Sequence, residues 1–94
     1  MSKSIAIILP AYNEELTIVD TMKDFFESCP DAGIYVVDNA SKDRTNELAR
    51  AAYEALGCKG RLLEEPRKGK AAAVRKAFME IDADIYVMAD ADMT

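Results

Sequence analysis

The chain has 94 residues, 50% of them hydrophobic and 31% charged, which is the composition of one small globular domain, or part of one, and not of a disordered segment. Its 12 basic and 17 acidic side chains give a net charge of −5, which argues against nucleic-acid binding through the phosphate backbone. Cys29 and Cys58 lie far apart and the chain has no histidine, so both cysteines are expected to be reduced and a zinc site is not expected.

Residues 5–30 begin with a strand pattern and continue with a helix pattern. The run Ile5–Leu9 is apolar, largely β-branched and closed by Pro10, which is typical of a strand buried on both faces of a parallel sheet. A helix is expected next, with Asn13 as its N-cap and Pro30 beyond its end. Its apolar positions are Ile18, Met22, Phe25, Phe26 and Cys29.

Residues 34–57 repeat this pattern. Ile34–Asp38 predicts a second buried strand, and the helix after it is expected to be capped near Ser41 or Asp43 and to end at Gly57. The apolar positions of this helix are Leu48, Ala52, Ala55 and Leu56.

A third strand and helix and a fourth strand follow. Arg61–Glu65 predicts a weaker strand, a helix is expected from about Gly69, and Asp84–Asp90 predicts the last strand. The apolar stripe of this helix is Val74, Ala77, Phe78 and Ile81.

This alternation of strands and helices predicts an α/β fold. Right-handed crossovers would give a parallel sheet of about four strands with helices on both faces. In the commonest doubly wound order, 3-2-1-4, strands one and four are neighbours and their carboxyl ends flank a ligand crevice. Functional side chains are therefore expected just after Leu9, Val37 and Ala89.

Two carboxylates, Asp90 and Asp92, follow the last predicted strand. Side chains two apart in an extended segment point the same way, so both can face one Mg²⁺ or Mn²⁺ ion. Such a cation usually completes its coordination with water and substrate phosphates, which favours a diphosphate ligand. The alternative is that Asp92 caps a following turn.

Three further residues at the strand ends suit a nucleoside. Asp38 has the position at which a doubly wound sheet places a carboxylate for base or ribose recognition. Tyr12 can stack on a base and Glu14 can bind a ribose hydroxyl. The structural alternatives are an Asx-turn for Asp38, rim packing for Tyr12 and a helix-dipole interaction for Glu14.

The stretch Arg67–Lys70 concentrates basic residues in an acidic chain, at the start of the third predicted helix. Free backbone N–H groups and the helix dipole favour phosphate there, and Gly69 allows a close backbone approach. The alternative is a solvated loop. Arg75 and Lys76 are expected to be ordinary surface residues.

Taken in order, four blocks of this sequence resemble family 2 glycosyltransferases of the GT-A fold. The blocks are Ile8–Glu15, Val36–Thr45, Lys68–Arg75 and Met88–Asp92. The last two are most similar to those of polyprenyl- or dolichyl-phosphate glucosyl- and mannosyltransferases. The resemblance spans nearly the whole chain and implies that residues 1–94 are the N-terminal, nucleotide-sugar-binding part of such an enzyme.

The resemblance implies inverting transfer of a sugar from UDP or GDP to an acceptor, with a divalent metal on the diphosphate. It implies that Asp38 reads the base, that Lys70 lies near the diphosphate, that Asp90 faces ribose or sugar hydroxyls, and that Asp92, with Asp90, binds the metal. The first nucleoside-contacting loop then comprises Pro10, Ala11, Tyr12 and Glu14.

One block departs from the family pattern, because the common Val-Asp-Asp-Gly-Ser is replaced by Val37–Ser41, with a neutral Asn39 and with Ala40 instead of glycine. This puts secondary contacts and donor choice in doubt, while the base contact by Asp38 stays expected.

In this family the acceptor site and the general base lie after the Asp-x-Asp motif, which Asp90 and Asp92 match here. No catalytic base is therefore expected among these residues, and the chain alone is expected to bind donor without transferring sugar. A polyprenyl phosphate is a possible acceptor. The N-terminal apolar run is too short for a signal peptide or membrane span, so a cytoplasmic location, or the cytoplasmic face of a membrane, is expected. The exposed edge of strand four predicts a homodimer.

Rival functions fit the strand ends less well. A sugar-phosphate nucleotidyltransferase or a dinucleotide-binding Rossmann protein would have a glycine-rich loop after strand one, where this chain has Pro10–Asn13. A non-catalytic receiver domain would have its acidic pair after strand one. The remaining alternative is an α/β domain that binds no nucleotide sugar.

Overall fold

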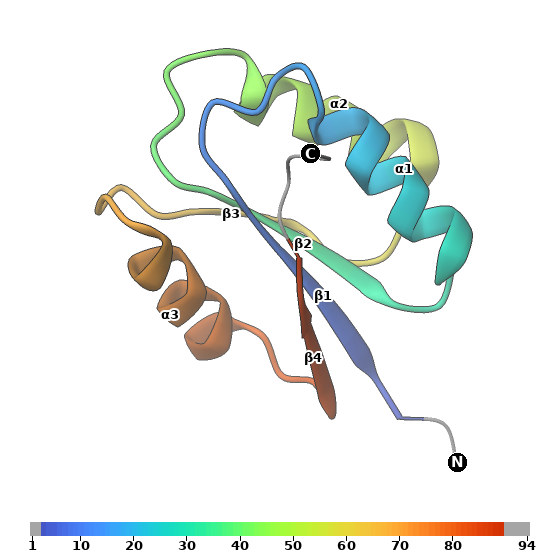
Figure 1. The fold of residues 1–94 in the computed structure, drawn as a ribbon. Helices are drawn as coiled ribbons and strands as arrows, with labels where there is room; N and C mark the ends of the chain where they lie inside the picture. The colour runs from blue at the N-terminus through green and yellow to red at the C-terminus, as the bar shows by residue number, and fades with distance from the viewer. Residues whose placement is uncertain (1–2, 90–94) are drawn as a thin grey trace.

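The computed structural model of the protein describes residues 3–89 and contains a four-stranded parallel sheet of order β3-β2-β1-β4. The strands are β1 (Ile5–Ala11), β2 (Gly33–Asp38), β3 (Leu62–Glu64) and β4 (Ile85–Met88). The helices are α1 (Ile18–Ser28), α2 (Thr45–Leu56) and α3 (Lys70–Glu80). The α/β class and the strand order predicted from the sequence are both confirmed (Figure 1).

The two faces of the sheet are covered by different helices. Figure 1 shows α1 and α2 on one face and α3 on the other. Side chains of β1 alternate between them: Ile7 and Leu9 pack in the cluster shared with α1 and α2, whereas Ala6 and Ile8 pack in the cluster shared with α3. This period of two is the pleat of a strand that is buried on both faces.

Strand β1 lies at the centre and runs further than its sequence pattern predicts. It continues through Pro10 to Ala11, and both residues pair with β2. Proline has no N–H to donate, but the carbonyl of Ile8 faces β4, where it accepts from the Ala89 N–H at 3.1 Å. The backbone nitrogen of Pro10, two residues further, faces the same side as that of Ile8. It lies beyond Met88, the last residue of β4, so the missing N–H costs no hydrogen bond between β1 and β4.

Helix α1 begins later than predicted. Its N-cap position is Thr17 and not Asn13, because a turn that starts at Glu14 comes before the first helical residue. Cys29 lies at the C-cap and is exposed, so it does not belong to the buried stripe. In α3 the expected apolar residue Phe78 is 50% exposed and makes an edge-to-face contact with Tyr86 at 5.0 Å.

Helix α2 ends as predicted, but its N-cap position is Arg44 and not Ser41 or Asp43; Asp43 anchors the start of the helix from one residue earlier. Gly57 follows its last residue in the left-handed conformation, which glycine adopts without steric cost. The Asp43 carboxylate accepts from the backbone N–H and the hydroxyl of Thr45. Burial raises the pKa of Asp43, but these bonds and that from the Glu15 N–H outweigh it and lower the pKa overall.

The hydroxyl of Tyr53 on α2 lies between β2 and the residue just before β3, where the two strands are not yet paired. It accepts from the Val36 N–H at 3.0 Å and lies 2.6 Å from the Ile34 carbonyl oxygen and 2.9 Å from that of Arg61. Tyr53→Phe is expected to lower the free energy of unfolding by about 1–3 kcal/mol, because the Val36 N–H loses its acceptor. Urea unfolding measures this change.

Burial raises the pKa of Tyr53 well above its ordinary value of 10.0. The folded state therefore holds the phenol proton more tightly, so this contribution to stability is complete below pH 10 and falls as pH rises above it. In Tyr53→Phe, the free energy of unfolding should therefore fall less steeply as pH rises above 10. Tyr12→Phe, at a 46% exposed tyrosine, is the control and should change stability by less than about 0.5 kcal/mol. Equal effects from both variants would contradict the prediction.

Strand β4 forms one edge of the described sheet. Three of its four residues, Ile85, Val87 and Met88, are exposed. Self-association through this edge stays a prediction. Among residues 3–89, no helix is both long and apolar enough to cross a membrane.

Candidate functional site

The carboxyl ends of β1, β2 and β3 meet at one edge of the sheet. Ala11 pairs with Asp38, and Asp38 pairs with Glu64. Beyond the strands, the Asn39 N–H donates to the Ala11 carbonyl at 2.8 Å, and the Glu65 N–H donates to the Asp38 carbonyl at 2.9 Å. The loops that follow the three strands therefore start side by side, as the strand order predicts.

Asp38 is the buried carboxylate of this edge, with only 5% of its surface exposed. Its Oδ1 accepts from the Ser41 N–H at 3.1 Å and its Oδ2 from the Asn46 amide at 2.9 Å. The Asn46 amide also lies 3.2 Å from Glu64 Oε2. The turn contact that the sequence offered as an alternative role is thus present. Each carboxylate oxygen has a second lone pair, so these two bonds do not exhaust its acceptor capacity.

The loop after β1 is fastened to the loop after β2 by hydrogen bonds between backbone and side chain. The Asn13 N–H donates to Ser41 Oγ at 2.9 Å, and Asn13 Oδ1 accepts from the Lys42 N–H at 2.8 Å. The Glu14 N–H donates to the hydroxyl of the fully buried Thr45 at 2.7 Å. Asn13 has a φ of 52°, in the left-handed region that asparagine tolerates.

The predicted nucleoside-contacting residues differ in exposure. Tyr12 is 46% exposed next to the buried Ala11, so its side chain is accessible at the surface. Pro10 is half-buried and pairs with Val37. The half-buried Glu14 carboxylate accepts from the Thr17 hydroxyl at 3.4 Å, which holds it at the turn before α1.

Asn39 joins the end of β2 to the loop before α3, and sequence reasoning missed this role. It is 7% exposed. Its amide nitrogen donates to the carbonyls of Glu65, at 3.0 Å, and Arg67. Its amide oxygen accepts from the Gly69 N–H at 3.0 Å. The sequence contained one signal for this role: Asn39 has an amide at a position where the family that the block Val37–Ser41 resembles usually has a carboxylate.

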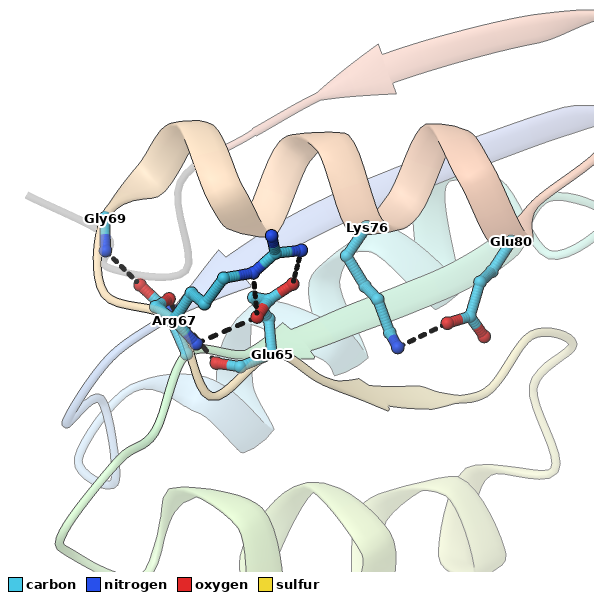
Figure 2. Close-up of polar contacts among 6 residues, drawn as sticks. Glu65, Arg67, Gly69, Lys76 and Glu80 are labelled. Carbon is cyan, nitrogen blue, oxygen red and sulfur yellow. Dashed lines mark hydrogen bonds and ion pairs between the residues drawn. The ribbon is translucent and has the colours of Figure 1, made fainter.

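Within the basic stretch, Arg67 and the two lysines have different surroundings. Figure 2 shows the Arg67 guanidinium turned onto Glu65, whose carboxylate accepts from it at two 3.3 Å contacts and from the Arg67 N–H at 2.8 Å. Arg67 is thus committed to an ion pair. Lys68 and Lys70 are exposed, and Lys70 is the first residue of α3, directly after Gly69.

Glu65 is the second buried carboxylate of this edge and was also missed, because the sequence placed it at the end of a weak strand. It is 3% exposed. Hydrogen bonds from the Arg67 side chain and then its backbone lower the pKa of Glu65, against a smaller opposing effect of burial. The charge of Lys76 acts in the same direction, and Lys76 pairs with Glu80 further along α3 (Figure 2). Arg75 is exposed, as predicted.

Ala40 has a φ of 60°, a conformation that costs a residue with a Cβ about 1–2 kcal/mol. Ala40→Gly removes this cost, but the unfolded chain gains some conformational entropy that folding must then remove. Because the second effect is smaller, the free energy of unfolding is expected to rise by about 0.5–1 kcal/mol. Chemical denaturation of both proteins provides the measurement.

The control for Ala40→Gly is Ala55→Gly, at an exposed position inside α2 with ordinary helical geometry. There glycine should lower stability by about 1 kcal/mol. A loss of stability at both positions would show that the conformation of Ala40 is not strained.

The predicted metal ligands Asp90 and Asp92 lie outside the described residues. Between residues 3 and 89, no group of three or more acidic or cysteine side chains is arranged to hold a metal ion. The last described residue, Ala89, lies beside Ile8 at the carboxyl edge of the sheet, and the two aspartates follow it in sequence. Oxygen donors are the ligands that suit Mg²⁺ and Mn²⁺.

An open hollow lies at the opposite edge, around the amino ends of β1 and β2. Its lining includes Lys3, Ser4, Lys59 and Asp82. Among residues 3–89, none of those predicted to bind nucleotide contributes to it. We therefore locate the candidate site at the carboxyl edge, where the two buried carboxylates gather.

Comparisons with known proteins point to one family. A family model described as "Glycosyl transferase family 2" matches residues 6–94. The chain is 42% identical to protein RfbJ of Shigella flexneri over 93 residues, which cover 99% of this chain and 67% of RfbJ. It is 30% identical to an undecaprenyl-phosphate 4-deoxy-4-formamido-L-arabinose transferase of Pseudomonas paraeruginosa, covering 95% of this chain and 28% of that protein.

Solved structures agree in fold and in sequence. A mannosyltransferase from Pyrobaculum calidifontis, in complex with GDP-Man and Mn²⁺, has a TM-score of 0.90 and 31% identity, over 98% of this chain and 28% of that one. A glucosyl-3-phosphoglycerate synthase from Mycobacterium tuberculosis, in complex with Mn²⁺, UDP-glucose and phosphoglyceric acid, has a TM-score of 0.81 and 26% identity, over 99% of this chain and 34% of that one. Apart from RfbJ, the chain therefore spans only about a third of these proteins.

Proposed function

The chain belongs to glycosyltransferase family 2, and from this we propose that it binds a nucleoside diphosphate sugar, UDP- or GDP-linked, at the carboxyl edge of its sheet. The sugar is then transferred, with inversion, to an acceptor. Structural neighbours bind GDP-Man or UDP-glucose together with Mn²⁺, which supports a donor of this class.

One observation carries the proposal: Asp38 is a buried carboxylate at the end of a central strand, with acceptor capacity left beyond its two protein bonds. A buried charge is costly unless its environment or a ligand compensates for it. A base N–H or a ribose hydroxyl is a donor that suits this carboxylate, and the exposed ring of Tyr12 lies one residue beyond its strand partner Ala11.

The other residues then have the following roles. Pro10 and Ala11 form the floor beside Asp38, Tyr12 stacks on the base, Glu14 accepts from a ribose hydroxyl, and Lys70 neutralises the diphosphate. Asp90 and Asp92 would hold Mg²⁺ or Mn²⁺, and the ion would supply positive charge next to the diphosphate.

The acceptor lies outside what these residues bind. The relative named as an undecaprenyl-phosphate transferase favours a polyprenyl phosphate, which would bring the protein to the cytoplasmic face of a membrane. For an acceptor that reacts through a hydroxyl, the general base is expected beyond Thr94, so these 94 residues alone should bind donor without turning it over.

Amide NMR during titration with UDP, GDP, UDP-glucose and GDP-mannose, each with and without Mg²⁺, tests the proposal. We expect metal-dependent shifts for one of the two nucleotides, at Tyr12, Asp38, Lys70 and Asp92. Shifts with UDP alone or with GDP alone identify the base. An unchanged spectrum of the folded protein with all four ligands would refute donor binding and favour an α/β domain without nucleotide-sugar binding.

A further inference from the structure

The side-chain amide of Asn39 makes three hydrogen bonds to the loop 65–69, all to backbone atoms. Its nitrogen donates to two carbonyls, those of Glu65 and Arg67, and its oxygen accepts from the Gly69 N–H. The reversed amide would put its oxygen against two carbonyls and its nitrogen against an N–H, so only this orientation is consistent. With 7% of its surface exposed, Asn39 has little capacity left for a ligand.

We propose that Asn39 is a positioning residue, which holds the loop 65–69 in the conformation that binds the donor's diphosphate. The inference rests on the proposed function. Asn39 follows Asp38 directly, so the same short segment carries the base-reading carboxylate and fixes the loop that leads to Lys70. The nucleoside end and the diphosphate end of the site are thereby held at a constant separation.

A contact between two residues of the loop 65–69 also stabilises its conformation. Glu65 accepts from both the backbone N–H and the guanidinium of Arg67, and its carboxylate is 3% exposed. Gly69, at a φ of 114°, turns the chain into α3. The loop is therefore fixed at three points before α3 begins, and a fixed loop has little conformational entropy left to lose when an anion binds.

The chemistry at position 39 requires an amide and not a carboxylate. An ionised aspartate is an acceptor only, so it would keep the contact with the Gly69 N–H but face the Glu65 and Arg67 carbonyls with no proton to share. Asn39→Asp, which introduces the residue common in the family, is thus expected to release the loop at two of its three points.

The test compares the affinities of nucleoside and nucleoside diphosphate by calorimetry, with uridine against UDP and guanosine against GDP in Mg²⁺. In Asn39→Asp we expect the ratio of diphosphate to nucleoside affinity to fall about tenfold or more, the effect of roughly one charge-assisted hydrogen bond, while nucleoside affinity changes less than about threefold. Thermal unfolding checks that the variant is folded.

The matched control is Asn13→Asp, which adds the same charge to a neighbouring loop but keeps the acceptor for the Lys42 N–H. Its ratio should change far less, because the added charge leaves the hydrogen bonds of the loop 65–69 intact. Asn39→Ala, which adds no charge, should reproduce the fall of the ratio. It also serves if Asn39→Asp does not fold.

Three results would overturn the inference: an unchanged ratio in both Asn39 variants, an equal fall in Asn13→Asp, or an equal loss of nucleoside and diphosphate affinity, which a general structural role would produce. Failure of the proposed function looks different, because the unaltered protein would then bind neither nucleoside nor nucleotide. In that case the positioning role is wrong as well.

Discussion

Asp92→Asn is expected to weaken binding of the nucleoside diphosphate sugar at least about 100-fold in the presence of Mn²⁺, because the cation that links protein and diphosphate loses a carboxylate ligand. With EDTA in place of Mn²⁺, the original protein and the variant should bind equally weakly. Calorimetric titration with and without the metal measures both quantities.

The control for this charge change is Asp24→Asn, on the exposed surface of α1. It also removes one negative charge and should leave the metal-dependent affinity within about twofold, since exposed charges are screened at physiological salt. If Asp92→Asn bound donor as well as Asp24→Asn in Mn²⁺, Asp92 would be the cap of a turn and not a ligand.

The second large effect is expected at Asp38. Asp38→Ala should lower affinity for the nucleoside about 10- to 100-fold, because a hydrogen bond to a charged acceptor in a buried site contributes about 1.5–3 kcal/mol. The loss should be equal with and without metal, since the base and ribose are bound independently of the cation. Titration of both variants with nucleoside and with nucleoside diphosphate sugar therefore separates Asp38→Ala from Asp92→Asn.

Asp38 also has structural bonds, so its control must remove one of them. Asn46→Ala deletes the donor to Asp38 Oδ2 while leaving the carboxylate in place. Both variants should melt at a lower temperature, but only Asp38→Ala should lose most of the nucleoside affinity. Equal affinities in the two variants would make the Asx-turn the whole role of Asp38.

Much of the fold was predictable because its signals are local and repeated. Continuous apolar runs such as Ile5–Leu9 and Ile34–Asp38 indicate strands buried on both faces, and their alternation with helical patterns leaves few sheet topologies. The start of α1 was not predictable, because Asn13 has the chemistry of an N-cap but its side chain binds the Lys42 N–H across the loops. The sequence suggested that Asn13 caps the nearby helix, whereas in the folded chain it binds a residue of the loop after β2.

The positions of site residues at the strand ends were predictable, whereas the contacts between residues of the loops were less so. The neighbouring positions of Ala11 and Asp38 follow from parallel pairing alone. The buried Glu65 and its ion pair with Arg67 depend on how the loop folds back, which no periodic pattern encodes. The basic stretch was expected near phosphate as a whole, and the pairing of the Arg67 guanidinium with a carboxylate of the same loop was not foreseen.

The central place of β1 in the sheet also bears on the order in which the protein assembles. Pairing of β1 with β2 joins segments whose first partners, Ala6 and Gly33, are close in sequence, whereas pairing with β4 joins Ile5 to Ile85. Closing the longer loop costs more chain entropy. During synthesis, β1 leaves the ribosome first and can dock on β2 early, yet one side of it must wait until nearly the whole of this sequence has emerged. Until then the backbone of β1 on that side is an open strand edge, which is a hazard for aggregation of the nascent chain.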